Sequence, residues 1–210
     1  AGAARAEGRG GVSTGHRSPA AQARAVADAL TNEFAHYCDR WEIAGSLRRG
    51  APDVGDIEVV AVPRLAPSEV QTLFGPVATP PRFELDDVLA EHLTRGAIQH
   101  APHKGWGERQ KKFMFDGVQI DLYITDAARF GVILLIRTGP QEFSHALAAW
   151  MQRGGDWRFA GGALEYRSGD AIGWLAHPTP EERDVFAALG LSYIEPAQRS
   201  LSALEQTING

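Results

Sequence analysis

The sequence predicts an α+β fold, in which a mixed β-sheet has helices on one side and is followed by a small α+β C-terminal lobe. Helical and strand periodicities alternate irregularly along the chain, a turn signal joins two of the strands, and one β-branched apolar run is typical of an interior strand. With 210 residues, of which 44% are apolar, the chain is long enough to bury a core.

The chain begins with a segment rich in Gly, Ala, Ser and Arg. Residues 1–19 lack apolar periodicity, so we expect a mobile tail there. The next segment has apolar residues at helical spacing and predicts one amphipathic helix. These residues are Val26, Leu30, Phe34, Tyr37 and Cys38.

Two strands and a second helix are expected next. A short strand is predicted at residues 41–44, and the β-branched run at 57–62, ended by Pro63, predicts a central strand. Residues 83–95 have the spacing of a helix, with Gly96 at its C-terminal end.

The following strands, 110–115 and 118–124, flank Asp116 and Gly117, a dipeptide that favours a tight hairpin turn. Asp126 is expected to cap a helix that stops before Gly139 and Pro140. Because the patterns change near residue 131, we expect a first domain at 20–130 and a C-terminal subdomain at 131–210.

The C-terminal subdomain is expected to contain a helix at 141–152, whose Phe143, Trp150 and Met151 we assign to the core. Short strands are predicted within 157–167. Thr179 opens a capping box that predicts a last helix, ending at Gly190.

The composition of the chain argues against several classes of protein. No stretch approaches the roughly 18 apolar residues of a membrane span, so no membrane partner is expected. Cys38 is the only cysteine, which excludes an internal disulfide and favours a reducing intracellular compartment such as the cytoplasm rather than secretion. The net charge of -5 disfavours a wholly basic nucleic-acid coat protein but allows a local positive groove.

Two carboxylates open the predicted central strand. Asp56 and Glu58 lie two residues apart and therefore face the same way, about 6.6 Å apart along the strand. Such a pair would repel unless cations neutralise it. Oxygen ligands without His or Cys favour Mg²⁺, with Mn²⁺ as a substitute.

A third acid, Asp121, alternates with Ile120 and Leu122 and therefore takes the other face of its strand. If that strand lies beside the strand of Asp56, the three acids could hold the two cations of a phosphoryl-transfer site.

A turn containing Gly45 and Ser46 precedes these acids. Glycine lets a phosphate approach the backbone, and Arg48 or Arg49 can add charge-assisted hydrogen bonds, so a triphosphate would fit there. Taken alone, this segment and the turn at Gly55 are also compatible with ordinary turns and solvated arginines. The combination with the acids favours phosphate chemistry.

The spacing resembles a known superfamily. Gly45 and Ser46, nine further residues, and then Asp56 and Glu58, with Asp121 on a later strand, are similar to the nucleotidyltransferase signature of family X DNA polymerases. The resemblance continues from Gly131 through Thr138-Gly139 to Glu195-Pro196, so that it covers roughly residues 20–200.

The resemblance implies a nucleotidyltransferase palm and a nucleotide-selecting C-terminal subdomain. A strand's 3'-hydroxyl would attack the α-phosphate of a (deoxy)nucleoside triphosphate and release pyrophosphate, in short gap filling or repair-type synthesis. Asp56, Glu58 and Asp121 would be the catalytic metal ligands, with Asp121 accepting the hydroxyl proton. The implied nucleotide-binding residues are Gly45, Ser46, Arg49, Gly55, Arg137, Thr138 and Gly139.

The chain departs from the family in several places. No helix-hairpin-helix motif precedes the metal-binding region, so we expect a form similar to the minimal viral members. Glu58 replaces a more usual Asp, and Gln119 stands where an arginine often precedes the third acid. Ile136 and Arg137 replace a common aromatic pair, which leaves the choice between ribo- and deoxynucleotides open.

A basic segment with an aromatic residue is a candidate DNA contact. Its cations are Lys104, Arg109, Lys111 and Lys112. The expected partners are a nucleoside triphosphate and primer-template or gapped DNA, bound by a monomer that a protein partner could assist. Action on RNA ends, small molecules or protein, template-independent terminal transfer, and a silent nucleic-acid-binding scaffold are the alternatives.

Overall fold

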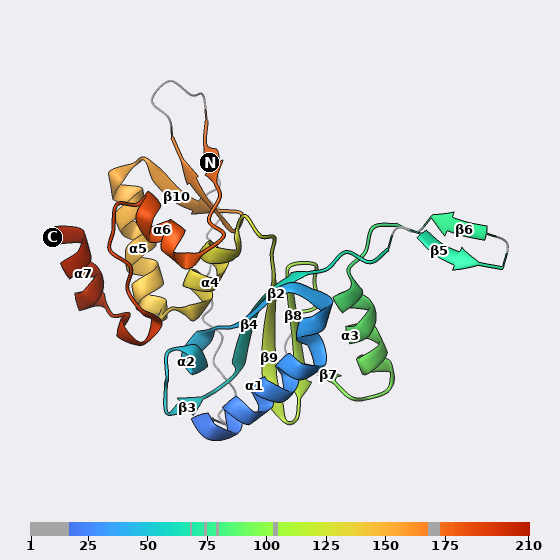
Figure 1. The fold of residues 1–210 in the computed structure, drawn as a ribbon. Helices are drawn as coiled ribbons and strands as arrows, with labels where there is room; N and C mark the ends of the chain where they lie inside the picture. The colour runs from blue at the N-terminus through green and yellow to red at the C-terminus, as the bar shows by residue number, and fades with distance from the viewer. Residues whose placement is uncertain (1–16, 68, 74, 79, 103–104, 168–172) are drawn as a thin grey trace, which may run out of the picture.

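The computed structural model of the chain describes residues 17–67, 69–73, 75–78, 80–102, 105–167 and 173–210. Within these residues, none of the helices combines the length and the apolar character that a membrane span requires. Figure 1 shows a sheet with α1 and α3, a lobe formed by the C-terminal helices, and a hairpin that projects beyond α3.

A mixed five-stranded sheet is the largest within the described residues, with the strand order β2-β4-β9-β8-β7. Its strands are β2 (Cys38–Ile43), β4 (Ile57–Pro63), β7 (Gln99–His100), β8 (Gln110–Phe115) and β9 (Val118–Ile124). The pair β4 and β9 is parallel, whereas the other pairs are antiparallel. The predicted mixed sheet and α+β class are therefore confirmed, with β4 as an interior strand beside the middle strand β9.

The predicted hairpin is confirmed at its boundaries. Asp116 and Gly117 both have positive φ angles, 48° and 76°, and link β8 to β9 with no further residue between the strands. This turn fixes the pairing, so that Lys112 lies directly opposite Asp121.

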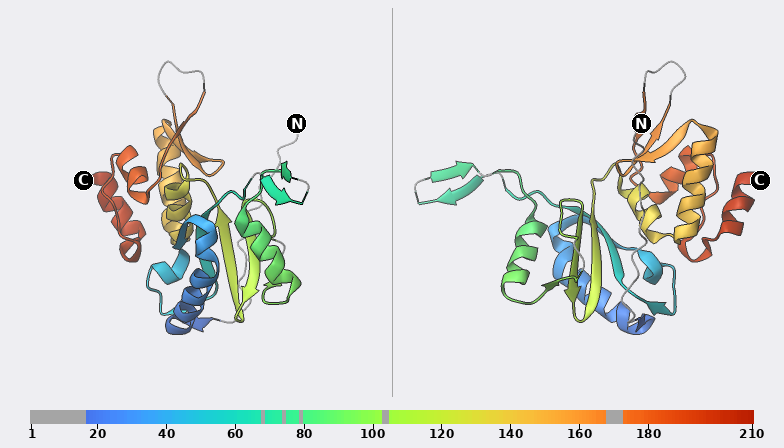
Figure 2. Two further views of the ribbon diagram at one scale, coloured as in Figure 1. Left: turned by 45° about the vertical axis from the view of Figure 1, so that its right-hand side comes forward. Right: turned by 180° about the vertical axis from the view of Figure 1, so that it is seen from behind.

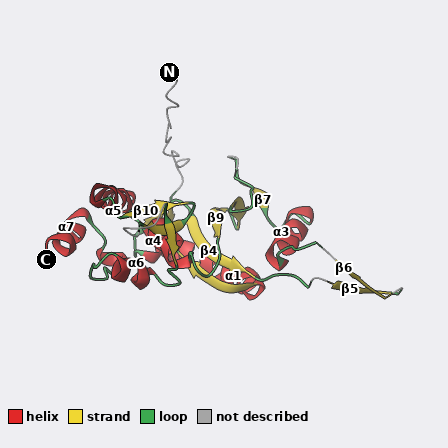
Figure 3. Ribbon diagram, turned by 90° about the horizontal axis from the view of Figure 1, so that it is seen from above, coloured by secondary structure: helices red, strands yellow, loops and turns green. Residues whose placement is uncertain are grey.

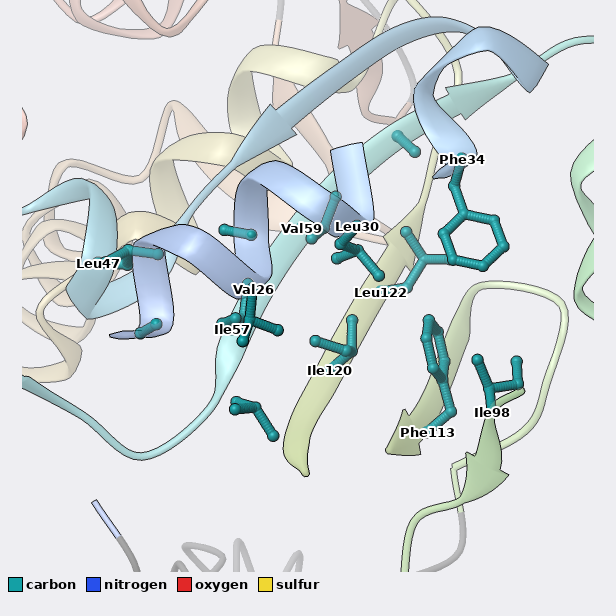
Figure 4. Close-up of a cluster of buried hydrophobic side chains, with 14 of the residues drawn as sticks. Val26, Leu30, Phe34, Leu47, Ile57, Val59, Ile98, Phe113, Ile120 and Leu122 are labelled. Carbon is teal, nitrogen blue, oxygen red and sulfur yellow. The ribbon is translucent and has the colours of Figure 1, made fainter. Parts of the chain in front are cut away.

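One face of the sheet is covered by α1 (Ala20–Phe34) and α3 (Glu84–Thr94). Figure 4 shows Leu30 and Phe34 of α1 directed toward strand residues such as Val59 and Leu122. These side chains are buried and belong to one core cluster. Burial of each aliphatic or aromatic side chain contributes about 1.5–3 kcal/mol, which explains why α1 docks here.

The opposite face of the sheet is only partly covered. Phe130 and Leu134 of α4 (Phe130–Thr138) pack against Val60 and Tyr123. Because side chains alternate along a strand, Glu58 and Asp121 share this second face. Helices α1 and α3 thus lie on one side as expected, whereas α4 lies on the other.

The C-terminal lobe consists of α4, α5 (Gln141–Gly154), α6 (Glu182–Ala188), η2 (Pro196–Gln198), α7 (Leu201–Asn209) and the sheet of β10 (Trp157–Ala160), β11 (Ala163–Tyr166) and β12 (Leu175–His177). Figure 2 shows it from two sides. Phe143 and Met151 are buried in its core, as predicted, and Trp150 packs against that core. The domain boundary at residue 131 stays a prediction.

Several shorter elements join these parts. They are β1 (Ser18–Pro19), η1 (Ala35–Tyr37), α2 (Gly45–Arg48), β3 (Asp53–Val54), β5 (Glu69–Thr72) and β6 (Gly75–Ala78). The hairpin of β5 and β6, which the sequence pattern did not predict, projects from the molecule in Figures 1 and 3. The expected tail lies outside the described residues up to residue 16, and Ser18 and Pro19 pair with β3.

Four local predictions need correction. Cys38 belongs to β2 and not to the first helix. Its side chain is buried in the same core as those of the helix, and its apolar character therefore resembled a continuation of the helical pattern. The strand predicted at 41–44 accordingly ends at Ile43, and Ala44 precedes α2. Asp126 does not cap α4 directly: its side chain accepts a hydrogen bond from the Arg129 amide, and α4 begins at the next residue, Phe130.

Thr179 does not cap α6. Its amide donates to the Ala128 carbonyl and its carbonyl accepts from the Gly131 amide, at 2.7 Å each, so Thr179 is held against α4. Asp184 instead accepts a hydrogen bond from the Glu181 amide, and α6 begins at Glu182.

Candidate active site

Three acids meet on the partly covered face of the sheet. Asp56 directly precedes β4, Glu58 lies in β4, and Asp121 is the register partner of Glu58 in the adjacent parallel strand β9. Neighbouring strands are about 4.8 Å apart. The sheet thus brings together the three residues that the sequence singled out, which we call the acid face.

Burial and mutual repulsion both disfavour the charged form of the carboxylates in the acid face. Burial raises the pKa of Glu58 to about 7, with a further contribution from the charge of Asp56. Burial and the charge of Asp121 also raise the pKa of Asp56. A set of carboxylate ligands without histidine or cysteine is the type of ligand set that binds Mg²⁺ or Mn²⁺. The repulsion between these carboxylates provides a reason for a cation to bind.

Asp121 is already engaged by other groups. Its side chain is almost fully buried, and it accepts hydrogen bonds from Gln119 Nε2 at 2.8 Å and from the Tyr123 hydroxyl at 3.4 Å. The Lys112 ammonium lies 2.5 Å from Asp121 Oδ2. As they stand, no three of the described Asp, Glu, His or Cys side chains converge closely enough to hold a metal ion.

The glycine-serine turn lies against the acid face. Gly45 begins α2 with a φ angle of 65°, and a Cβ atom placed there would lie 2.3 Å from Glu58 Oε2. The Ala44 amide also donates to the Glu58 carbonyl at 2.8 Å. Only glycine therefore permits this approach. Ser46 follows in α2, and Gly55 lies between β3 and β4.

Two predicted nucleotide-binding segments meet beside this turn. An Arg49 guanidinium nitrogen donates to the Thr138 carbonyl, and Arg48 Nη1 donates to Thr138 Oγ1 at 2.9 Å. Gly139, the next residue, lies near the Arg49 guanidinium. Residues from α2 and from the end of α4 are thereby held together although about 90 positions separate them.

Arg137 projects from α4 toward the same face. Its guanidinium carbon lies 3.9 Å from the centre of the Tyr123 ring, a distance typical of a cation–π contact. Its charge acts against the raised pKa of Glu58. Sequence reasoning missed Tyr123 here, although period-two alternation places it on the face of Asp121.

A second charge cluster, which we call the lobe clasp, joins α2 to the C-terminal lobe. It consists of Arg48, Glu182 and Arg199. Glu182 Oε2 lies 2.7 Å from Arg48 Nη2, and Glu182 Oε1 lies 2.9 Å from Arg199 Nη1. Burial alone would raise the pKa of Glu182, but the two guanidinium groups hold it below its usual range. No local sequence pattern pointed to this cluster.

The four proposed DNA contacts have different positions. Lys111 is buried, because it points to the α3 face, where its ammonium lies 3.0 Å from Asp86 Oδ1. A DNA contact by Lys111 is therefore not supported. Lys112 points to the acid face, and Arg109 is exposed and donates to the Gly161 carbonyl at 3.3 Å. Lys104 lies outside the described residues.

Comparisons with known proteins found two similarities. Residues 133–200 match the family described as DNA polymerase beta thumb. The chain is 27% identical over 166 residues to DNA polymerase lambda of Rattus norvegicus. This alignment covers 74% of the chain but only 28% of that polymerase, so the chain spans little more than a quarter of the relative's length. Together with the mixed α+β fold, these matches support a family X polymerase-like protein.

Proposed function

We propose that the chain catalyses DNA-directed nucleotidyl transfer, adding a nucleotide from a (deoxy)nucleoside triphosphate to a 3'-hydroxyl during short gap filling or repair-type synthesis. One observation carries the proposal: Glu58 and Asp121 are neighbours on parallel strands, with the Gly45 turn directly against Glu58. Carboxylates beside a glycine-serine turn are the combination that nucleotidyl transfer requires.

In this proposal Asp56, Glu58 and Asp121 would hold Mg²⁺ or Mn²⁺. The bound cation supplies charge neutralisation for the phosphates and for the attacking hydroxyl. Asp121, whose carboxylate is almost fully buried, would accept the hydroxyl proton.

The nucleotide would lie between the acid face and the end of α4. Ser46 and Arg49 would contact the triphosphate, and Gly45 and Gly55 would let it approach the backbone of their turns. Arg137, Thr138 and Gly139 would then lie on the side of the sugar and base. The contacts of Arg48 and Arg49 with Thr138 support this assignment, because they hold both segments in one place.

DNA would be bound weakly and with strong salt dependence. Of the described candidate cations, Arg109 is exposed and Lys112 points to the sheet's second face, where it pairs with Asp121, whereas Lys111 is buried. Affinity that depends on few phosphate contacts falls as salt rises. We propose that the chain acts as a monomer, with residues 20–130 as the palm, and that a protein partner assists DNA binding.

The test is primer extension by the full chain with Mg²⁺, on one-nucleotide-gapped DNA. Asp121→Asn is expected to lower the rate by at least about a hundredfold, because it removes a charge needed in the transition state. Asp116→Asn, in the exposed β8–β9 turn, is the matched control and is expected to retain the rate.

Extension that Asp121→Asn leaves unchanged would refute the assignment of the acid face. Additional substrates separate the alternatives. Equal extension of an unpaired single strand would indicate terminal transfer, and addition only to RNA ends would exclude DNA-directed synthesis as the activity.

A further inference from the structure

Lys112 and Asp121 form an ion pair in the centre of the proposed metal site. The two residues are directly opposite each other in the β8–β9 pairing. The Lys112 ammonium lies 2.5 Å from Asp121 Oδ2, and the side chains are 25% and 4% exposed. The pair is thus largely shielded from solvent, which strengthens it relative to an exposed pair.

The backbone around Gly105 gives the Lys112 side chain a defined position. A Cβ atom at residue 105 would lie 2.6 Å from Lys112 Cγ and 2.7 Å from Cδ. The Lys112 amide also donates to the Gly105 carbonyl at 2.6 Å. The aliphatic part of the lysine therefore lies directly against a residue without a side chain, which directs the ammonium toward Asp121.

The three acids differ in how far neighbouring groups compensate their negative charge. Both oxygens of Asp121 have partners, Gln119 on Oδ1 and Lys112 with Tyr123 on Oδ2. Asp56 and Glu58 form no ion pair with any described residue, and burial, with a further contribution from the neighbouring carboxylates, raises their pKa values. This difference provides a reason why the described acids do not converge as a ready metal site.

We propose that Lys112 is a positioning residue that competes with the divalent cation for the Asp121 carboxylate. In the metal-free chain the ammonium holds Asp121, and a cation that binds all three acids must take over the position of that ammonium at Oδ2. The inference rests on the proposed metal site and adds a determinant of its affinity. Both the occupied oxygen and the positive charge of Lys112 oppose cation binding, so removal of the lysine is expected to increase the affinity for the cation.

The experiment measures binding of Mn²⁺ alone to the full chain, after chelator treatment and without nucleotide or DNA, from the electron paramagnetic resonance signal of free Mn²⁺. Lys112→Met is expected to bind Mn²⁺ roughly fivefold more tightly, the scale of one partly exposed ion pair. Structural damage would weaken binding instead. Adding Asp121→Asn to Lys112→Met is expected to abolish the gain.

Lys111→Met is the matched control, since it makes the same change one residue earlier, where the side chain faces Asp86 instead of the acid face. It is expected to leave Mn²⁺ affinity unchanged. Lys112→Arg keeps the charge and is expected to bind no more tightly than the unmodified chain. If Lys112→Met does not fold, as judged by circular dichroism, Lys112→Gln takes its place with the same expected gain.

The outcomes separate this inference from the metal site itself. Binding by the unmodified chain, with no gain in Lys112→Met, would overturn the competition and leave the metal site intact. Absence of binding in every variant would overturn both. Binding that appears only after removal of Lys112 would support the competition in its strongest form.

Discussion

The acid face and the lobe clasp are both clusters of partly or fully buried charge, but they are compensated in opposite ways. In the lobe clasp, Glu182 lies between two guanidinium groups, and its pKa is held below its usual range. In the acid face, Glu58 lies among other carboxylates, and its pKa rises to about 7. The protein itself neutralises the charge of Glu182 in the lobe clasp, whereas neutralising the charge of Glu58 in the acid face requires a cation from outside the chain.

This difference separates structural from functional charge. A buried ion pair whose partners are fixed in the fold positions segments of the chain, and removing one partner leaves an uncompensated charge. Like charges that remain together in a fold store electrostatic cost, which a bound cation relieves. Substitutions that neutralise one glutamate in each cluster should therefore have opposite consequences for stability.

Glu58→Gln is the sharpest test on the acid face. Loss of one charge needed for catalysis is expected to lower the primer-extension rate by about a hundredfold to a thousandfold. The metal-free protein should meanwhile become more stable above pH 7, because the cost of burying the Glu58 charge and its repulsion with Asp56 are removed. Single-turnover extension and urea unfolding in EDTA measure the two effects. Glu205→Gln, an exposed change on α7, is the control, and lower stability in Glu58→Gln would contradict the comparison.

Glu182→Gln is the corresponding test on the lobe clasp. Arg199, whose side chain has no exposed area, would lose its charged partner, and the expected cost is about 3–5 kcal/mol in unfolding free energy. Glu181→Gln, one residue earlier, removes a more exposed partner of Arg40 and is expected to cost less than about 1 kcal/mol. Equal losses in urea unfolding would show that burial does not distinguish the two glutamates.

The acid face could be predicted further from the sequence than the lobe clasp. A two-residue turn at Asp116 and Gly117 pairs Phe115 with Val118 and, by counting outward, Lys112 with Asp121. Alternation along the same strand sends Lys111 to the other face. Grouping the basic residues as one DNA contact ignored this alternation, which explains why the group included Lys111, whose side chain is buried.

Long-range contacts and irregular segments could not be predicted in this way. Arg48 and Glu182 are 134 positions apart, and neither lies in a pattern that requires the other. The β5–β6 hairpin contains Pro76 within a strand, and a proline there argues against a strand on local grounds. Amphipathic spacing, by contrast, predicted α1, α3 and α5 because each buries one face against a core.

Gly45→Ala sharpens the comparison by adding an atom at the acid face. A positive φ angle costs an alanine about 1–2 kcal/mol, and the new Cβ atom would also displace the Glu58 carboxylate. Gly50→Ala has a similar φ angle of 78° but no atom within 4 Å of the new carbon, so it shares only the backbone cost. Both variants should lose stability in urea, whereas only Gly45→Ala should lose extension activity. Equal activity losses would contradict a specific role for the Gly45 contact.

The pH dependence of metal-free stability distinguishes the clusters without catalysis. Glu58 has a folded pKa of about 7, above its ordinary value of 4.5, so its favourable contribution is complete below pH 4.5 and is lost as the pH rises through 7. Glu182 has a lowered pKa, so its contribution is present above 4.5 and is lost as the pH falls below that value. Urea unfolding in EDTA from pH 3 to 8 should show a fall of about 2 kcal/mol between pH 5 and 7. Glu58→Gln should remove that fall but keep the loss at acidic pH, because the lobe clasp is unchanged; an unaltered fall would assign it to another group.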